Sequence, residues 1–595
     1  MKRQELLAAE YGYRWQDKPR AAVRVALAFP NVYQLGMSNL GFQLVWKAAH
    51  DHTEAAAERV FLPDAEEPAV PVSLESGRGL GDFDAIAFSL SYEQDYLNVL
   101  AMLDGARIPR RSADRRLDHP LVIAGGPALW GNPEPVAPFF DAIVIGEGEE
   151  VIGDILSCLA GHRARSGTRG RGGDRMQLLG ALAALPGLYV PALYEPTYLA
   201  GGAFAGLEPR LSAPESIERL WIRDLDRHPA QSVVLTPHTE FADTHLVEIA
   251  RGCSRSCRFC MAGFITRPVR YRPLDRLIQQ VDQGLLRTRK IGLLSASVSD
   301  HPDLVALGEH LRRREVRLYL SSIRADAVTP EFIALLRHGG LKSLTVAPEA
   351  GSESMRSRIN KHLTHRELMR CVQVAGEGGM QGLKYYVMVG LPHETDTDVQ
   401  ATIELVADTV KTGRPLGLRQ FVIDLHPFVP KAFTPFQREP QADIARFEKV
   451  LARLRGPMAR LGVRTRFDSP AWAVIQERLA RGDRRMADVI ERAYAAGGNL
   501  SAYRRALKEA DLPFGLGPDS VLPWAHIQSG LEPRFLANEA QRARRGLQSP
   551  PCPISAPLAL AYPTCRRCGV CGGGGAAGQP GREPGYEPQG AGMDR

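Results

Sequence analysis

The sequence predicts an α/β protein in which a doubly wound parallel sheet is followed by a partial (β/α)6 barrel and a helical C-terminal extension. Six runs of β-branched and aliphatic residues alternate with helical patterns between residues 246 and 427. Five similar short runs precede them between residues 23 and 145. With 595 residues the chain is also too long for one hydrophobic core. Strand–helix alternation at this spacing is typical of parallel β/α units.

The barrel unit is predicted from strands that are each followed by an amphipathic helix. The expected strands are 246–250, 290–295, 316–322, 343–349, 383–390 and 420–427, and the expected helices are 274–286, 302–314, 331–337, 366–378 and 396–412. Six such units make a partial TIM-type barrel, whose working residues lie at the carboxyl ends of the strands.

The N-terminal unit is predicted as an open sheet covered on both faces. The expected strands are 23–29, 69–73, 85–90, 121–124 and 142–145, and the expected helices are 40–50, 95–104 and 135–139. Sheets of this kind bind ligands outside the carboxyl ends of their strands. There the chain carries residues 31–41, 89–91, 125–127 and 146–148, and the glycines among them allow a ligand to approach the backbone.

Three cysteines, Cys253, Cys257 and Cys260, follow the first barrel strand with the spacing C-x3-C-x2-C. Thiolates are the ligands of iron–sulfur clusters, and three of them on a four-iron cluster leave one iron open for chemistry. Structural zinc is the alternative interpretation, but zinc sites generally need four ligands in two paired knuckles. No fourth partner lies near this motif in the sequence.

This motif, with the aromatic Phe259 before its last cysteine, resembles the signature of the radical S-adenosylmethionine (SAM) superfamily. The resemblance implies a 4Fe–4S cluster on Cys253, Cys257 and Cys260, and SAM bound at the open iron. An electron from the cluster would cleave SAM to a 5′-deoxyadenosyl radical, so an electron donor such as flavodoxin or ferredoxin is expected as a partner. No catalytic residue beyond the cluster is predicted.

The resemblance also implies residues that hold SAM at the ends of later strands. Ser322 and Arg324 resemble the contact with the ribose and the carboxylate. Glu349 resembles the glutamate turn of methylthiotransferase-like cores, and Leu391 and Pro392 resemble the motif that lies along the adenine. Phe259 completes the predicted set. Residues 295–299 are serine-rich where many relatives carry glycine–glycine–glutamate, so no contact to the methionyl amine is predicted.

The order of the N-terminal loops resembles the cobalamin-binding domain that precedes many radical SAM barrels. The residues predicted to contact cobalamin are Tyr33, Gly36, Met37, Ser89, Leu90, Gly125, Gly126, Gly146 and Glu147. The loop after the first strand has no histidine to ligate cobalt from below. The alternative is a Rossmann-like unit without a cofactor that serves as a lid. A methylthiotransferase would need three further cysteines in this unit, which contains only Cys158.

A second cysteine group, Cys552, Cys565, Cys568 and Cys571, lies in a Pro/Gly-rich tail. Its four thiols predict either a zinc knuckle or an auxiliary iron–sulfur site, and the sequence leaves both open. We predict domains at residues 1–160, 161–238, 239–436, 437–545 and 546–595, with the tail largely disordered and an Arg/Gly-rich flexible insertion at 162–175.

Composition narrows the class of protein. Hydrophobic residues make up 44% and charged residues 24%, which is typical of a soluble globular protein. The first 20 residues have no apolar core for export, and no run approaches the length of a membrane span, so we expect a cytoplasmic protein. The net charge of +7 comes without interleaved aromatic residues, so nucleic-acid binding is not indicated.

The leading functional hypothesis is radical-mediated methyl transfer from cobalamin to an unactivated carbon. The first alternative is a cobalamin-independent radical rearrangement or cyclisation. The second is a non-catalytic iron–sulfur scaffold that binds RNA or a protein.

Overall fold

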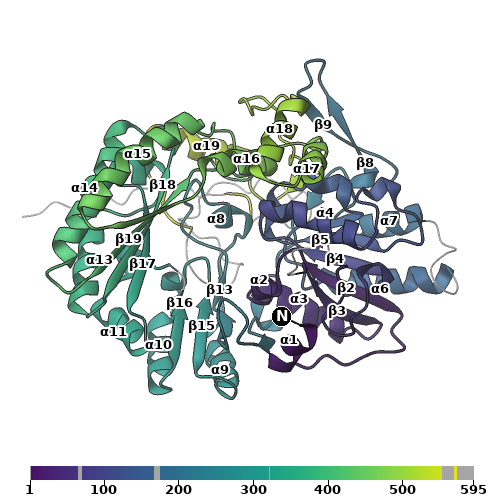
Figure 1. Cartoon of the computed structure of the whole chain (residues 1–595), viewed down its shortest axis with the longest axis horizontal. Coiled ribbons are helices and arrows are strands. Elements are labelled where there is room, and N and C mark those ends of the chain that lie inside the picture. The colour runs from purple at the N-terminus through teal and green to yellow at the C-terminus, as the bar shows by residue number, and fades with distance from the viewer. Residues whose placement is uncertain (1, 64–69, 167–174, 321, 553–567, 572–595) are drawn as a thin grey trace, which may run out of the picture.

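Two α/β bodies lie side by side in the chain, and the last helices run across the top of both (Figure 1). The structure is a computed structural model that describes residues 2–63, 70–166, 175–320, 322–552 and 568–571. The predicted fold class is confirmed, because both bodies contain parallel sheets covered by helices.

The N-terminal body is a six-stranded sheet in the order β3-β2-β4-β5-β6-β7. Its strands are β2 (Val23–Phe29), β3 (Ala55–Phe61), β4 (Ala85–Ser89), β5 (Leu121–Gly125), β6 (Ala142–Val144) and β7 (Leu188–Tyr189). All pairs are parallel except β6–β7. Since β2 lies between β3 and β4, the strand order reverses there, and the β2/β4 boundary is the topological switch point of a doubly wound sheet.

Strand β3 was not predicted, because its sequence Ala-Ala-Ala-Glu-Arg is typical of a helix. Long-range ion pairs compensate the charge of the buried Arg59 in this strand: its guanidinium lies 2.6 Å from Glu75 and 2.7 Å from Glu10. The strand predicted at 69–73 is wrong. Its described residues form only isolated bridges, Val72 to Gly79 and Ser73 to Val60.

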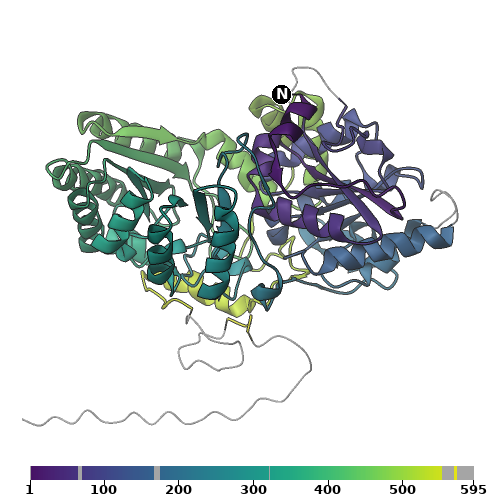
Figure 2. The ribbon, with the colours of Figure 1, turned by 90° about the horizontal axis from the view of Figure 1, so that it is seen from below.

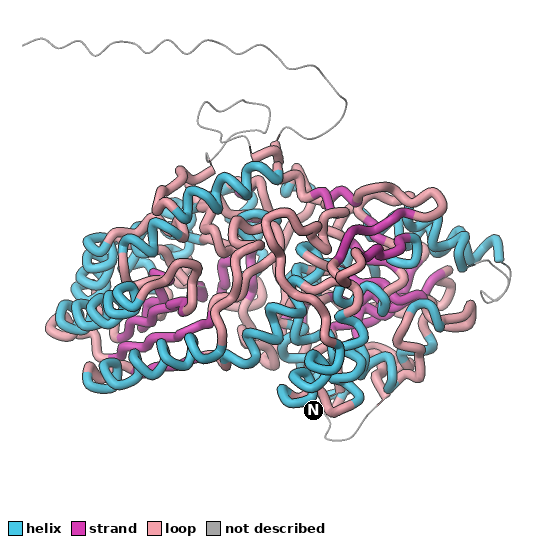
Figure 3. The backbone as a smooth tube through the Cα atoms, turned by 90° about the horizontal axis from the view of Figure 1, so that it is seen from above, coloured by secondary structure: helices cyan, strands magenta, loops and turns pink. Residues whose placement is uncertain are grey.

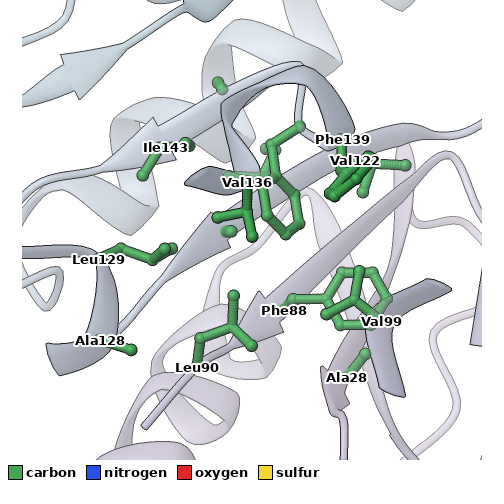
Figure 4. Packing of buried hydrophobic residues seen from close by; sticks show 14 of the residues in the cluster. Ala28, Phe88, Leu90, Val99, Val122, Ala128, Leu129, Val136, Phe139 and Ile143 are labelled. Carbon is green, nitrogen blue, oxygen red and sulfur yellow. The ribbon is translucent and has the colours of Figure 1, made fainter. Parts of the chain in front are cut away.

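Helices cover both faces of this sheet. They are α3 (Leu40–Asp51), α4 (Tyr96–Gly105), α5 (Pro127–Gly131), α6 (Val151–Ser166) and α7 (Arg175–Ala183), and the short helix predicted at 135–139 is the 3₁₀ helix η4 (Glu134–Phe139). Figure 4 shows the core where Phe88 and Val122 of the strands meet Val99 of α4 and Phe139 of η4. Residues 162–166 of the predicted insertion belong to α6, and residues 167–174 lie outside the described residues.

The second body contains the six predicted parallel strands and one more. They are β12 (His245–Glu248), β15 (Lys290–Leu294), β16 (Arg317–Leu320), β17 (Ser343–Glu349), β18 (Gly382–Val389), β19 (Gln420–Pro427) and the additional β20 (Arg464–Phe467). The first three form one sheet and the last four another, and a parallel bridge between Ile323 and Val346 joins them.

Helices α9 (Leu274–Leu285), α10 (Leu304–Arg313), α11 (Pro330–His338), α13 (His365–Glu377), α14 (Asp396–Gly413) and α15 (Ile444–Arg460) cover the outside of this half-barrel. Strand β18 shows how the two faces differ. Tyr385 points outward, where its hydroxyl lies 3.0 Å from the Thr409 hydroxyl of α14. Lys384, Tyr386 and Met388 therefore line the inner face, since side chains alternate along a strand.

The C-terminal helices connect the two bodies. Helix α17 (Met486–Ala495) packs on α4 and η4, α16 (Pro470–Arg481) packs on η4, and α18 (Leu500–Ala510) packs on α16 and α17. Helix α19 (Pro533–Arg544) lies beside the short α12 (Glu353–Arg358) of the barrel. Figure 2 shows α19 on the lower side of the molecule, and Figure 3 shows strands enclosed by helices in both bodies. None of the helices among the described residues combines the length and the apolar character that a membrane span requires.

Candidate active site

The cysteine loop leaves the carboxyl end of β12 through the short strand β13 (Ala250–Arg251), which pairs with β14 (Arg270–Tyr271). Gly252 has φ +90°, and a Cβ there would lie 2.6 Å from the Thr266 carbonyl oxygen. The turn into Cys253 therefore requires glycine. The predicted position of the loop at the end of the first barrel strand is confirmed by the order of these elements.

The three motif thiols affect one another's ionisation; Cys257 is buried, and Cys253 and Cys260 are half-buried. Burial, and then the neighbouring Cys257, raises the pKa of Cys253; burial, and then the other two thiols, raises the pKa of Cys260 to about 12. Thiolates crowded in this way repel one another, and a bound cationic iron centre reverses that balance by stabilising all three. The donor set therefore fits an iron–sulfur cluster. A site for a single metal ion is a different matter: among the described residues, no group of three or more His, Cys, Asp or Glu side chains is placed to bind one ion together.

Segments far away in the sequence hold the cysteine loop. The Arg258 side chain, fully buried between Cys257 and Phe259, donates to Glu539 of α19 at 2.9 and 3.1 Å. The Asn360 amide donates to the Ser256 carbonyl oxygen at 3.2 Å. Glu539 and Asn360 were missed by the sequence reasoning, because nothing local marks a residue that contacts a motif 281 or 104 positions away.

Two of the predicted SAM-binding side chains lie beside the cysteines as members of ion pairs. Glu349, with φ +66°, accepts from the Lys361 ammonium at 3.1 Å. Burial opposes the charge of Lys361, but Glu349 and then Cys257 raise its pKa overall. The Arg324 guanidinium forms a two-point contact with Asp326 at 2.9 and 3.0 Å. Lys361 and Asp326 were not predicted, and only their proximity in the fold identifies them.

The remaining predicted SAM residues fall into an apolar group and one exposed position. Phe259 packs with Leu391 in a small cluster of apolar residues, and Pro392 is also buried, whereas Ser322 is exposed. Next to β15, the Oγ atoms of Ser297 and Ser299 are buried and have no hydrogen-bond partner among the described residues. These two serines belong to the serine-rich segment 295–299, which takes the place of the glycine–glycine–glutamate motif described above.

The residues predicted to contact cobalamin serve contacts within the chain. A Cβ on Gly126 would lie 2.4 Å from the Leu90 carbonyl oxygen, and one on Gly146 would lie 2.2 Å from that of Leu220. Gly36 faces the Phe61 ring in the same way. The Cβ side of these glycines therefore packs against the chain itself, and their predicted contact with a ligand stays a prediction.

The other members of that set follow the same rule. The Tyr33 hydroxyl donates to Glu10 at 2.7 Å, and the Met37 sulfur lies 3.3 Å from the Arg59 guanidinium. Leu90 and Glu147 are buried. Ser89 and Gly125 are half-buried and face each other across the β4–β5 pair. At the switch point itself, the Asn31 amide donates to Asp95 at 2.8 Å. The loops after β2 and β4 are thus tied to each other.

Glu147 instead joins the two bodies. Its carboxylate accepts from Arg270 at 2.7 and 2.9 Å and from Arg251, two residues before the first cluster cysteine, at 3.1 Å. Burial raises its pKa, but Arg270 and then Arg251 outweigh burial and lower it. The carboxylate therefore remains ionised and holds the strand that leads into the cysteine loop.

The predicted tail site is only partly within the described residues. The Cys552 backbone N–H donates to the Ser254 carbonyl oxygen at 2.6 Å, which places Cys552 against the cysteine loop. Cys568 is buried and its carbonyl oxygen accepts from Glu532, whereas Cys571 is exposed. Cys565 lies outside the described residues, so the four-cysteine site stays a prediction.

Two family models match the chain. Residues 41–191 match "Radical SAM proteins, N-terminal", and residues 247–406, which include the cysteine loop and four of the six predicted strands in full, match "Radical SAM superfamily". The chain belongs to the radical SAM superfamily. Superfamily members use a 4Fe–4S cluster and SAM.

This radical SAM protein is 27% identical over 489 residues to an uncharacterised protein, MJ0966, of Methanocaldococcus jannaschii, covering 81% of this chain and 94% of the relative. The solved structure of the cobalamin-dependent SAM radical enzyme OxsB is similar with TM-score 0.45 at 13% identity, covering 65% of this chain and 52% of that one. The radical SAM methyltransferase TsrM of Kitasatospora setae is similar with TM-score 0.41 at 14% identity, covering 68% and 72%. Both structural likenesses are too distant to carry an argument.

Proposed function

We propose that the protein cleaves SAM reductively at the cysteine loop and uses the resulting radical to abstract hydrogen from a small substrate. The observation that carries the proposal is the arrangement of three coupled thiols beside the Lys361–Glu349 pair at the carboxyl ends of the barrel strands. Cys253, Cys257 and Cys260 would hold a 4Fe–4S cluster, which would supply the electron for cleavage of SAM to the 5′-deoxyadenosyl radical.

The protein's own residues bind, orient and exclude water. Lys361 presents an ammonium and Glu349 a carboxylate beside the cluster loop, and these match the carboxylate and the hydroxyl groups of SAM. Phe259 and Leu391 supply an apolar wall for the adenine. Ser297 and Ser299 offer unpaired hydroxyls to the methionyl amine. A protein donor such as flavodoxin or ferredoxin is the proposed electron source.

Methyl transfer from cobalamin to an unactivated carbon is the finer reaction within this proposal. It is supported by the order of loops in the N-terminal unit, which resembles that of cobalamin-binding domains. The second candidate is a rearrangement or cyclisation without cobalamin, which is supported by the absence of a histidine from the loop at residues 31–41 that could ligate cobalt. The residues named from the sequence as cobalamin contacts stay a prediction within this proposal.

The test is anaerobic reconstitution with iron and sulfide, followed by SAM, dithionite and hydroxocobalamin. Production of 5′-deoxyadenosine and cobalamin retained after gel filtration are read together. We expect 5′-deoxyadenosine from the wild type and from the matched control Cys158→Ala, and none from Cys257→Ala. Retained cobalamin supports methyl transfer, and cleavage without it supports the second candidate. A bound cluster without SAM cleavage would overturn the proposal and favour a non-catalytic scaffold.

A further inference from the structure

A cavity of about 460 Å³ lies where the N-terminal body, the barrel and the helical extension meet. Leu97 and Asn98 come from α4, Pro427 ends barrel strand β19, and Trp472 and Tyr503 come from α16 and α18. Figure 1 shows α16 and α18 above α4 between the two bodies. A volume of roughly 300–1,000 Å³ is typical of sites for small molecules.

One polar side chain of the cavity wall has no partner. Tyr503 is only 1% exposed, and its hydroxyl forms no hydrogen bond within the described part of the chain. Its ring packs edge-on against Trp472 at 5.9 Å. A buried hydroxyl without a partner costs stability, so a ligand that pairs with it gains what the free protein lacks. Burial raises the pKa of Tyr503, which keeps the phenol protonated as a donor and an acceptor.

Two amide side chains of the wall present acceptors to the cavity. The Asn98 amide nitrogen already donates to the Pro30 carbonyl oxygen at 2.8 Å, and that of Gln476 donates to Glu93 at 3.2 Å. Their carbonyl oxygens have no donor partner among the described residues, which leaves them open to a ligand's N–H or O–H groups.

The charge of the wall has one sign. Asp468 is the one acidic residue among the described lining residues, and no Lys or Arg lines the cavity in the described part of the chain. Asp468 accepts from the His426 Nδ1 atom at 2.7 Å, and His426 lies on the inner face of β19 with its ring 5.5 Å from Tyr386. The acidic end of the cavity therefore adjoins the inside of the barrel.

We propose that this cavity is the substrate pocket of the radical reaction, and that it takes a small neutral or cationic molecule with an apolar body and N–H or O–H donors. The inference rests on the proposed function and adds the chemical class of its substrate. Phosphorylated and carboxylate-bearing molecules are rejected, because the wall carries the Asp468 carboxylate and, among the described residues, no Lys or Arg to pair with an anion. Trp472 contacts the apolar body, and Tyr503, Asn98 and Gln476 pair with its donors.

The test compares three probes of one shape that differ in charge: phenethylamine, phenylacetamide and phenylacetate. Each is titrated by calorimetry into the reconstituted full chain. We expect the amine to bind about two- to fivefold more tightly than the amide, a modest preference because Asp468 is 70% exposed. Phenylacetate is expected to bind at least about tenfold more weakly than the amide, since burying its charge without a partner is costly.

Variants locate the binding. Trp472→Ala is expected to weaken all three probes, Asp468→Asn to remove the preference for the amine, and Tyr503→Phe to weaken the amide about three- to tenfold. Tyr198→Phe, in the remote β8 (Tyr194–Tyr198), is the matched control and is expected to change nothing.

Equal binding of phenylacetate, no saturable binding of any probe, or unchanged binding in Trp472→Ala would each overturn the proposal. Formation of 5′-deoxyadenosine is measured on the same preparation. SAM cleavage without probe binding contradicts this inference alone, and probe binding without SAM cleavage contradicts the proposed function alone.

Discussion

Glu539 of α19 is expected to fix the C-terminal segment on the cysteine loop, and Glu539→Ala tests this. The variant leaves Arg258 buried without its carboxylate. The Glu539 carboxylate also accepts from the Ser549 hydroxyl at 2.7 and 2.8 Å, and the Ser549 backbone N–H donates to Asn360 at 2.7 Å. One substitution thus removes the anchor of a segment that reaches Cys552.

The magnitude follows from the cost of an uncompensated buried charge, about 3–5 kcal/mol when one partner of a buried ion pair is removed. If this energy is lost only from the resistance of residues 545–552 to local opening, the open population rises by roughly two to four orders of magnitude. Glu539→Gln keeps an acceptor of the same shape and is expected to cost about 1–3 kcal/mol.

Hydrogen exchange measured by mass spectrometry on peptides covering 545–552 reads the opening, and iron content reads the loop. The matched control is Glu509→Gln, which breaks an exposed pair with Arg505 at 3.9 Å and is expected to change stability by under about 0.5 kcal/mol. Wild-type exchange together with full iron content in Glu539→Ala would refute the reasoning.

Three further predictions concern single carboxylates. Burial raises the pKa of Glu394 to about 7 from its usual 4.5, so its contribution to stability is full below about pH 4.5 and is lost as pH rises through 7. The free energy of unfolding of Glu394→Gln is therefore expected to exceed that of the wild type by up to about 3 kcal/mol at pH 8, and the two are expected to differ by under about 1 kcal/mol at pH 5. Equal denaturation midpoints at pH 8 would contradict this. Glu349→Gln, which leaves Lys361 unpaired, is expected to weaken SAM binding about 10- to 100-fold by equilibrium dialysis, and unchanged affinity would remove Glu349 from the SAM site. Glu147→Ala is expected to lower the iron retained after reconstitution, whereas Glu147→Asp retains part of it; full retention in both would show that the arginine contacts do not position the loop.

The sequence by itself determined the cluster motif, the barrel strands and the class of chemistry. These features are local: thiol spacing over eight residues identifies the ligand set, and apolar periodicity over short windows identifies strands and helices. The same local reasoning failed at β3. Its alanines and charged residues read as a helix, while burial of Arg59 between Glu10 and Glu75 stabilises the strand.

Only the tertiary structure decided which residues surround the cysteine motif and which residues pack against the glycines at the ends of the strands. Lys361, Asn360 and Glu539 reach the cysteine loop because α12 and α19 lie side by side, which no local pattern encodes. The glycines after β5 and β6 carry the residue type that ligand approach requires, and the fold also requires glycine there because Leu90 and Leu220 lie against the Cβ side of Gly126 and Gly146. The cavity at Tyr503 likewise depends on three segments that meet only in the fold, because burial and unpaired polar groups are properties of packing rather than of sequence neighbours.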